Sequence, residues 1–212
     1  MKTKVLFLTA VFAISSFVLM AQENEKKNFI WEYQKKNETK TIGLYGGLFY
    51  SYSEIMDKSA GYLGAEIGVV LNQKWAVGLS GAAINFDYNL DELVSDGTYR
   101  LEGGHTGMFV KYIIPFSDWG NLNFSVYSGY GTVNYRYNKE YREERPWYQE
   151  IIDTENYAVL EPGIEFDVRV AGKWWLGAKA TYVTTSPVEF MGTNENFLEN
   201  YTLGLSIKYG IF

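Results

Sequence analysis

The chain has 212 residues, enough for one domain with a sizeable buried surface, and a second domain is not expected. Its net charge of -6 gives no reason to expect nucleic acid as a partner, and the absence of cysteine excludes disulfides and thiol chemistry. Aromatic residues make up 17% of the chain although its mean hydropathy is slightly negative, which suits a sheet with one apolar and one polar face.

Residues 1–21 have the pattern of a secretory signal peptide. Lys2 and Lys4 form a basic start, an apolar run extends from Val5 to Met20, and Ala21 offers a small residue at which cleavage can occur. The alternative is an N-terminal membrane anchor, but the run is short of the roughly 20 apolar residues that a spanning helix needs. We therefore predict an exported protein.

Residues 22–40 are charged and follow neither a helical nor a strand period, so we predict a periplasmic N-terminal lead there. From residue 41 onward, runs of strand character alternate with turn signals. We expect about eight strands, at 41–53, 61–71, 75–88, 99–115, 121–137, 157–170, 174–184 and 201–212. An even number of strands can close with both ends on one side, so residues 41–212 are predicted to form an all-β, closed antiparallel up-and-down transmembrane β-barrel.

The expected connections alternate in length. Tight turns follow the second, fourth and sixth strands, at 72–74, 117–120 and 171–173, whereas long polar segments follow the third, fifth and seventh. Outer-membrane barrels have short periplasmic turns and long outer loops, although lipocalin-like soluble barrels approach the same pattern. The alternation therefore favours the outer membrane as the location.

Several strands alternate with a period of two. In the strand 157–170, Leu160, Ile164 and Phe166 fall on one face, and Glu161 and Glu165 fall on the other. The strands 61–71, 174–184 and 201–212 repeat this pattern. Alternation alone does not distinguish a soluble barrel from a membrane barrel, so the signal peptide, the loop lengths and the aromatic residues decide the interpretation.

Aromatic residues gather near both ends of the expected barrel, as in the interfacial girdles of membrane barrels. One group lies beside the tight turns: Trp75, Trp119, Trp174, Trp175, Tyr209 and Phe212. The other lies toward the long loops: Tyr50, Tyr52, Tyr88, Tyr99, Tyr137, Tyr157 and Tyr182. The alternative explanation is that tyrosine and tryptophan simply favour strands.

The second half of the chain carries the residues of a family resemblance. They are the segment from Leu160 to Val168, the segment from Trp174 to Gly177, and Tyr182, with weaker support from the segments 45–47, 77–81 and 207–212. On these residues the sequence resembles small outer-membrane β-barrel proteins of Bacteroidetes-type bacteria. The resemblance implies a barrel in the cell outer membrane and implies no reaction, substrate or catalytic residue.

The C-terminal aromatics Tyr209 and Phe212 are a candidate assembly signal. In barrels of this class the resemblance implies that terminal aromatics are recognised by the barrel-assembly machinery, which we expect as a partner alongside outer-membrane lipid. The usual second aromatic lies two residues before the end, and Gly210 stands there in this chain.

Charged residues of both signs fall on the inward face. Opposite charges should pair there, because a lone charge in a water-poor lumen costs several kcal/mol. We predict a Glu165–Lys179–Lys208 ladder within an interior network formed by Glu66, Lys111, Glu161, Glu165, Asp167, Arg169, Lys179 and Lys208. A barrel of eight strands is filled by side chains, so a polar plug is expected, with a narrow gated conduit as the alternative. Pro162 cannot donate to a ladder hydrogen bond, so it predicts a bulge or bend with irregular pairing near Glu161–Gly163.

No residue pattern indicates catalysis. The only histidine, His105, is expected near the outer rim, where it would be the base of a lipid-modifying enzyme, but no serine stands in a nucleophile motif. We expect no metal site and no cofactor, since acidic residues at 87, 91, 92 and 96 lack the spacing of a calcium loop.

The predicted function is accordingly a non-enzymatic barrel with a structural or surface-interaction role. A possible recognition patch lies in the loop 138–156, where it could bind an extracellular or envelope protein; it consists of Arg142, Arg145, Trp147 and Tyr148. The alternative is an ordinary charged loop whose aromatics fold back onto the rim.

Overall fold

The computed structural model describes residues 31–35, 38–56, 58–89, 99–138, 149–189 and 193–211. The predicted signal peptide, Phe212 and the predicted recognition patch lie outside these ranges. Within them, the chain has no helix with the length and apolar character that a membrane-spanning helix requires.

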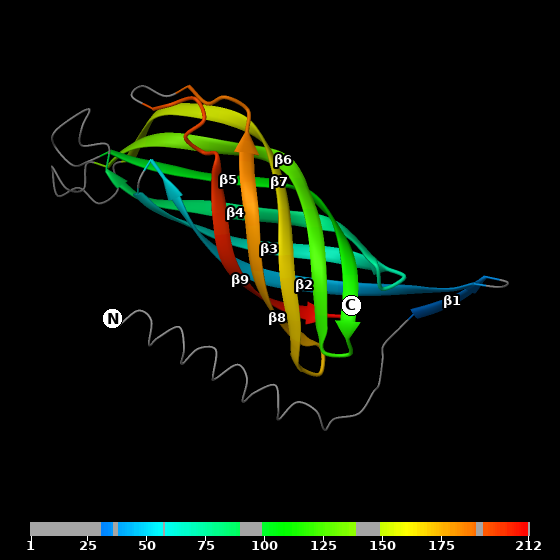
Figure 1. Cartoon of the computed structure of the whole chain (residues 1–212). Helices are drawn as coiled ribbons and strands as arrows, with labels where there is room; N and C mark the ends of the chain where they lie inside the picture. The colour runs from blue at the N-terminus through cyan, green and yellow to red at the C-terminus, as the bar shows by residue number, and fades with distance from the viewer. Residues whose placement is uncertain are drawn as a thin grey trace, which may run out of the picture.

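The described chain is built from antiparallel strands that pair in chain order (Figure 1). They are β1 (Trp31–Lys35), β2 (Glu38–Ile55), β3 (Lys58–Leu71), β4 (Trp75–Asn89), β5 (Tyr99–Ser117), β6 (Gly120–Asn138), β7 (Gln149–Ala171), β8 (Trp174–Thr185) and β9 (Asn200–Gly210). Because β2 also pairs with β9, the strands β2 to β9 close into an eight-stranded barrel. The predicted fold class is therefore confirmed.

Two strand boundaries differ from expectation. The end of the predicted lead, residues 22–40, contains β1, which pairs with the start of β2 and projects beyond the end of the barrel (Figure 1). Strand β7 begins at Gln149, so the loop expected over 138–156 is shorter than predicted. In both places charged residues, which are weak strand formers in isolation, are extended by pairing with a neighbouring strand.

Short and long connections occupy opposite ends of the barrel, as predicted. The turns 72–74, 118–119 and 172–173 lie at one end, called here the tight-turn end, and the strand ends that flank the segments 90–98 and 139–148 lie at the other, called the long-loop end (Figure 1). Asn72, Gln73 and Gly172 have positive φ angles of 52°, 57° and 51°, which is the geometry that closes tight hairpins.

The side chains alternate between the lumen and the outer face. On β9, Leu203 and Leu205 point outward, and Leu205 is 69% exposed, whereas Thr202, Ser206 and Lys208 point into the lumen. On β7, Ile164 and Phe166 are exposed while Glu165 and Asp167 are buried. The predicted faces of both strands are thus confirmed.

Inward glycines make room for large rings in the lumen. A Cβ atom at Gly64 would collide with the ring of Phe49, and one at Gly131 would collide with the ring of Tyr157. Each of these rings therefore lies over a glycine of the neighbouring strand, where there is no side chain to occupy the same space.

The irregular pairing expected at Glu161–Gly163 is present, but it takes the form of a gap in one ladder rather than a bulge. On one side Pro162 pairs in regular register with Val126 of β6. On the other side, the pairing with β8 stops after Leu160 and resumes at Gly163 without a change of register. The missing proline N–H is thus accommodated by a local gap in one ladder rather than by an extra residue.

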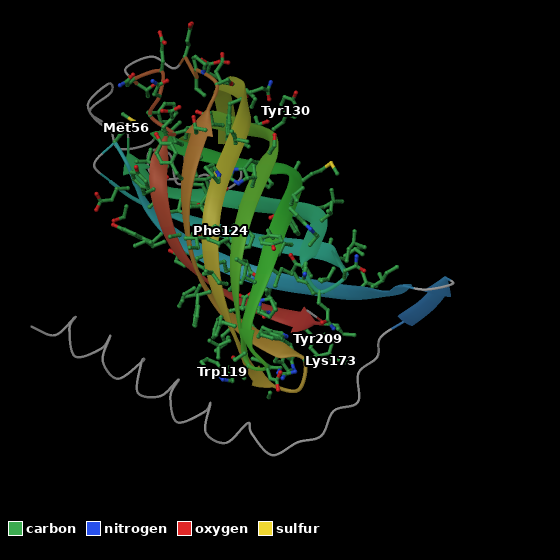
Figure 2. All side chains as sticks on the ribbon, turned by 45° about the vertical axis from the view of Figure 1, so that its right-hand side comes forward. Met56, Trp119, Phe124, Tyr130, Lys173 and Tyr209 are labelled. Carbon is green, nitrogen blue, oxygen red and sulfur yellow. The ribbon has the colours of Figure 1, made fainter. Side chains whose placement is uncertain are left out.

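Most of the predicted aromatic residues at the tight-turn end are exposed, namely Trp75, Trp119, Trp174 and Tyr209. Figure 2 shows Trp119 and Tyr209 at this end. Trp175 is an exception, because it points into the lumen and is buried. At the long-loop end Tyr50, Tyr52, Tyr130 and Tyr201 are exposed, whereas Tyr157 is buried in the lumen. The girdle assignments of Trp175 and Tyr157 are therefore wrong: each lies at an odd-numbered, inward position of its strand.

Candidate functional site

The lumen near the tight-turn end contains a cluster of buried charges, called here the lower charge cluster: Glu66, Lys111, Glu165, Asp167 and Lys208. Lys111 Nζ donates to Glu66 Oε1 at 2.6 Å and to Glu165 Oε2 at 3.1 Å. Lys208 Nζ lies 2.6 Å from Glu165 Oε2 and 2.8 Å from Asp167 Oδ2. Lys111 thus bridges two carboxylates, and Lys208, whose Nζ also lies 4.0 Å from Glu66 Oε1, is near three.

Neutral side chains complete the hydrogen bonding of these carboxylates. Asn123 Nδ2 donates to Asp167 Oδ2 at 2.7 Å, and Ser206 Oγ donates to Glu165 Oε1 at 2.7 Å. The residues of the network come from β3, β5, β6, β7 and β9. Because buried charges are stable only when they are paired and hydrogen-bonded, this network joins strands that are not neighbours in the barrel wall.

A second group lies farther from the tight turns. Lys179 Nζ is 3.9 Å from Glu161 Oε1 and 3.8 Å from the centre of the Phe49 ring. His105 Nε2 is 4.0 Å from Glu161 Oε2, and the imidazole packs between Tyr62 and Tyr127. We call Glu161, Lys179 and His105 the middle cluster.

The structure thus divides the charged residues proposed from the sequence. Five of them form the lower charge cluster, and Glu161 and Lys179 belong to the middle cluster. The expected Glu165–Lys179–Lys208 ladder is wrong in one member, since the ion pair recorded for Lys179 is with Glu161. Arg169 lies apart: its guanidinium donates to the backbone oxygen of Asp118 and sits 5.6 Å from the Trp175 ring.

A small cavity separates the two clusters. Its volume is ≈ 40 Å³, and its lining includes Glu66, His105, Tyr127 and Lys179. This is about the space of three water molecules. This cavity is therefore too small for a solute much larger than water.

The outer half of the lumen is apolar, whereas the sequence predicted a polar interior throughout. Inward side chains of the strands pack there against one another, namely Ile55, Tyr62, Ile84, Leu101, Val133, Tyr157, Val159 and Val183. The connection between β8 and β9 contributes Val188, Phe197 and Leu198 to the same core. This part of the barrel is packed as a hydrophobic core and closed by its own loop.

Hydrogen bonds fasten this loop to the barrel. Asn200 Nδ2 donates to the backbone oxygen of Leu198 at 2.8 Å, and Ser53 Oγ donates to Asn200 Oδ1 at 2.6 Å. Thr184 Oγ1 also donates to Glu199 Oε1 at 2.8 Å. The described segments 186–189 and 193–199 are therefore held to the barrel, and their residues Val188, Phe197 and Leu198 lie in the packed lumen.

Sequence reasoning missed Asn123 and the loop residues of the apolar core. Asn123 could have been identified, because on β6 it alternates with Leu122 and Phe124 on the opposite face. Phe197 and Leu198 had no such signal, since loop residues carry no strand period. His105, expected near the outer rim, lies in the middle of the lumen.

Among the described residues, no group of three or more His, Cys, Asp or Glu side chains is arranged to hold a metal ion. Of the predicted assembly signal, Tyr209 is described: it is exposed, and its ring lies 4.9 Å from that of Trp174.

Comparison with known proteins identifies the fold. No protein-family profile matches the sequence, and no curated protein matches it. Among solved structures, neisserial surface protein A (NspA) is 10% identical with a TM-score of 0.50; the match covers 82% of this chain and 99% of that one. The outer membrane protein OprG from Pseudomonas aeruginosa is also 10% identical with a TM-score of 0.50, over 80% of this chain and 95% of that one. The chain therefore has the fold of small eight-stranded outer-membrane barrels.

Proposed function

We propose that this chain is an integral outer-membrane barrel, closed to solutes, with a structural or surface-interaction role. The tight turns would face the periplasm and the long connections the exterior. The exposed aromatics near both ends would lie at the two membrane interfaces.

The apolar outer face carries this proposal. Exposed leucine and isoleucine side chains cover the wall on β2, β3 and β9, and Leu63, Leu203 and Leu205 are each more than 60% exposed. A soluble monomer rarely exposes an apolar surface that runs continuously around the molecule. Hydrocarbon is the solvent that suits such a wall.

Cell fractionation tests the location. The mature chain is expected in the outer-membrane fraction, and it should stay there after washing with alkaline carbonate, which releases peripheral proteins. Recovery of the chain as a soluble periplasmic protein would contradict the proposal.

We propose the long connections as the surface that meets a partner. The connection between β6 and β7 carries Arg142, Arg145, Trp147 and Tyr148, residue types that are frequent in binding hot spots. The barrel-assembly machinery is a second proposed partner, as expected for a chain of this fold. The resemblance to Bacteroidetes-type barrels remains a prediction.

The second candidate function is a narrow conduit for solutes. The packing of side chains in the lumen does not favour it. Planar bilayers containing the purified protein should show no single-channel currents, because two charge clusters and an apolar core lie in series along the lumen. Glu165→Gln should leave this silence unchanged. Regular wild-type currents that Glu165→Gln alters would favour the conduit instead.

We also propose that the chain is not an enzyme. The ring of His105 packs between Tyr62 and Tyr127 beside a cavity of ≈ 40 Å³. A lipid or acyl substrate could not reach the imidazole without displacement of the apolar core above it.

A further inference from the structure

A large groove lies on the outer face of the barrel, at the tight-turn end of the seam between β2 and β9. Its volume is ≈ 620 Å³, within the usual range for ligand pockets. Its lining is mostly apolar and includes Ile42, Leu44, Ile67, Tyr209 and Ile211. The groove is thus on the surface that the proposed function places in the membrane.

Gly46 forms the floor of this groove. It pairs with Tyr209 on β9 and with Ile67 on β3, and both of these side chains point outward beside it. A Cβ atom at Gly46 would meet nothing closer than the backbone oxygen of Glu66, at 3.7 Å. By contrast, a Cβ at Gly47 or Gly210 would collide with neighbouring atoms. The absence of a side chain at Gly46 therefore deepens the groove between Ile67 and Tyr209.

A cation lies at the end of the groove. Lys173 belongs to both the groove lining and the turn between β7 and β8, and its backbone oxygen accepts a hydrogen bond of 3.0 Å from Gly210 N. Figure 2 shows Lys173 beside Tyr209 at the tight-turn end. The Tyr209 and Trp174 rings form an exposed aromatic pair at the same level, where headgroups of a bilayer would lie.

From this arrangement we propose that the groove binds one phospholipid of the leaflet on the tight-turn side. An acyl chain would lie over Gly46 between Ile67 and Tyr209, and the phosphate would lie near the Lys173 ammonium. The apolar lining of the groove suits the acyl chain of such a lipid, and the cation at headgroup level suits its phosphate. The inference rests on the proposed function, since it requires a barrel that spans a bilayer.

The occupant is a lipid rather than a second copy of the chain because the site is a groove with an apolar lining and one cationic residue, Lys173. A flat, self-complementary patch would be needed for a two-fold interface between barrels. A narrow trough with one charged end fits a single chain-like ligand better.

The test is to fill the groove without disturbing the lumen. Gly46→Leu adds a side chain in open space, and Gly81→Leu is the matched control at an outward position of β4, where a Cβ makes only ordinary contacts. Each mature protein is purified in detergent, incubated with dioleoyl phosphatidylglycerol and analysed by native mass spectrometry. The mobility of the unheated protein on a denaturing gel shows that each variant is folded.

We expect one retained lipid per wild-type barrel and the same for Gly81→Leu. In Gly46→Leu, lipid retention should fall about tenfold. This is the effect expected if roughly two methylene groups of the acyl chain lose their contact with the groove. Equal retention by all three folded proteins would overturn the proposal, as would a dimer that Gly46→Leu abolishes.

Two further measurements test the headgroup. Lys173→Gln should lower retention of phosphatidylglycerol about threefold, the effect of losing one partly screened charge. Dioleoylglycerol, which has the same acyl chains without the phosphate, should bind wild type and Lys173→Gln equally. If Lys173→Gln leaves phosphatidylglycerol retention unchanged, the assignment of the phosphate is wrong. These results concern only the groove, because failure of the proposed function would appear as a chain that does not enter the membrane fraction at all.

Discussion

Lys208→Met is expected to lower the free energy of unfolding of the barrel by about 3–5 kcal/mol. The Lys208 side chain is fully buried, with 0% exposure, and its ammonium pairs with Glu165 and Asp167. Methionine has a similar length but no charge, so two carboxylates would lose their shared partner in a lumen that water hardly enters. Urea unfolding of the protein in detergent micelles, followed by tryptophan fluorescence, measures the loss.

A double variant separates the loss of charge pairing from the loss of packing. Asp167→Asn combined with Lys208→Met removes one carboxylate together with the ammonium, which restores the net charge of the lower charge cluster. The double variant should therefore be more stable than Lys208→Met alone. If Lys208→Met unfolds within about 1 kcal/mol of wild type, the buried ion pairs contribute little and the account of the lumen is wrong.

Leu198→Asp is expected to release the β8–β9 loop from the lumen. Leu198 is 1% exposed within the apolar core, and a carboxylate placed there would have no partner. Its burial would cost about 3 kcal/mol, so the population with the loop undocked should rise roughly a hundredfold. Limited proteolysis reports this population, because cleavage requires the loop to leave the barrel.

Asn196→Asp is the matched control in the same loop. Its side chain is exposed, so the same charge can be added without burial, and cleavage should proceed at the wild-type rate. Equal cleavage of Leu198→Asp and Asn196→Asp would show that the loop does not close the lumen.

The order of the strands in the barrel wall and the face on which each side chain lies could be predicted from the sequence. Alternation on β7 and β9 identified which residues face inward, because a strand has only two faces and one of them is apolar throughout. The same alternation correctly predicted that five charged residues share the lumen, namely Glu66, Lys111, Glu165, Asp167 and Lys208.

Contacts across the lumen could not be predicted in the same way. Lys179 stands opposite Glu165 in the register, yet its ammonium lies beside Glu161, because a long inward side chain can extend along the lumen and the strand period does not give that direction. Burial of Phe197 and Leu198 depends on the path of a loop, and the groove at Gly46 depends on where β9 ends beside β2.

Because the β8–β9 loop packs into the barrel, it also determines which residues of this loop are accessible to an antibody. Asn194, Glu195 and Asn196 are exposed, but Phe197 and Leu198, which would dominate the binding of a serum raised against a peptide of residues 194–199, are hidden. Such a serum should recognise the denatured chain on a blot and fail to label intact cells. Immunological reagents for the native surface therefore need to be directed at other epitopes.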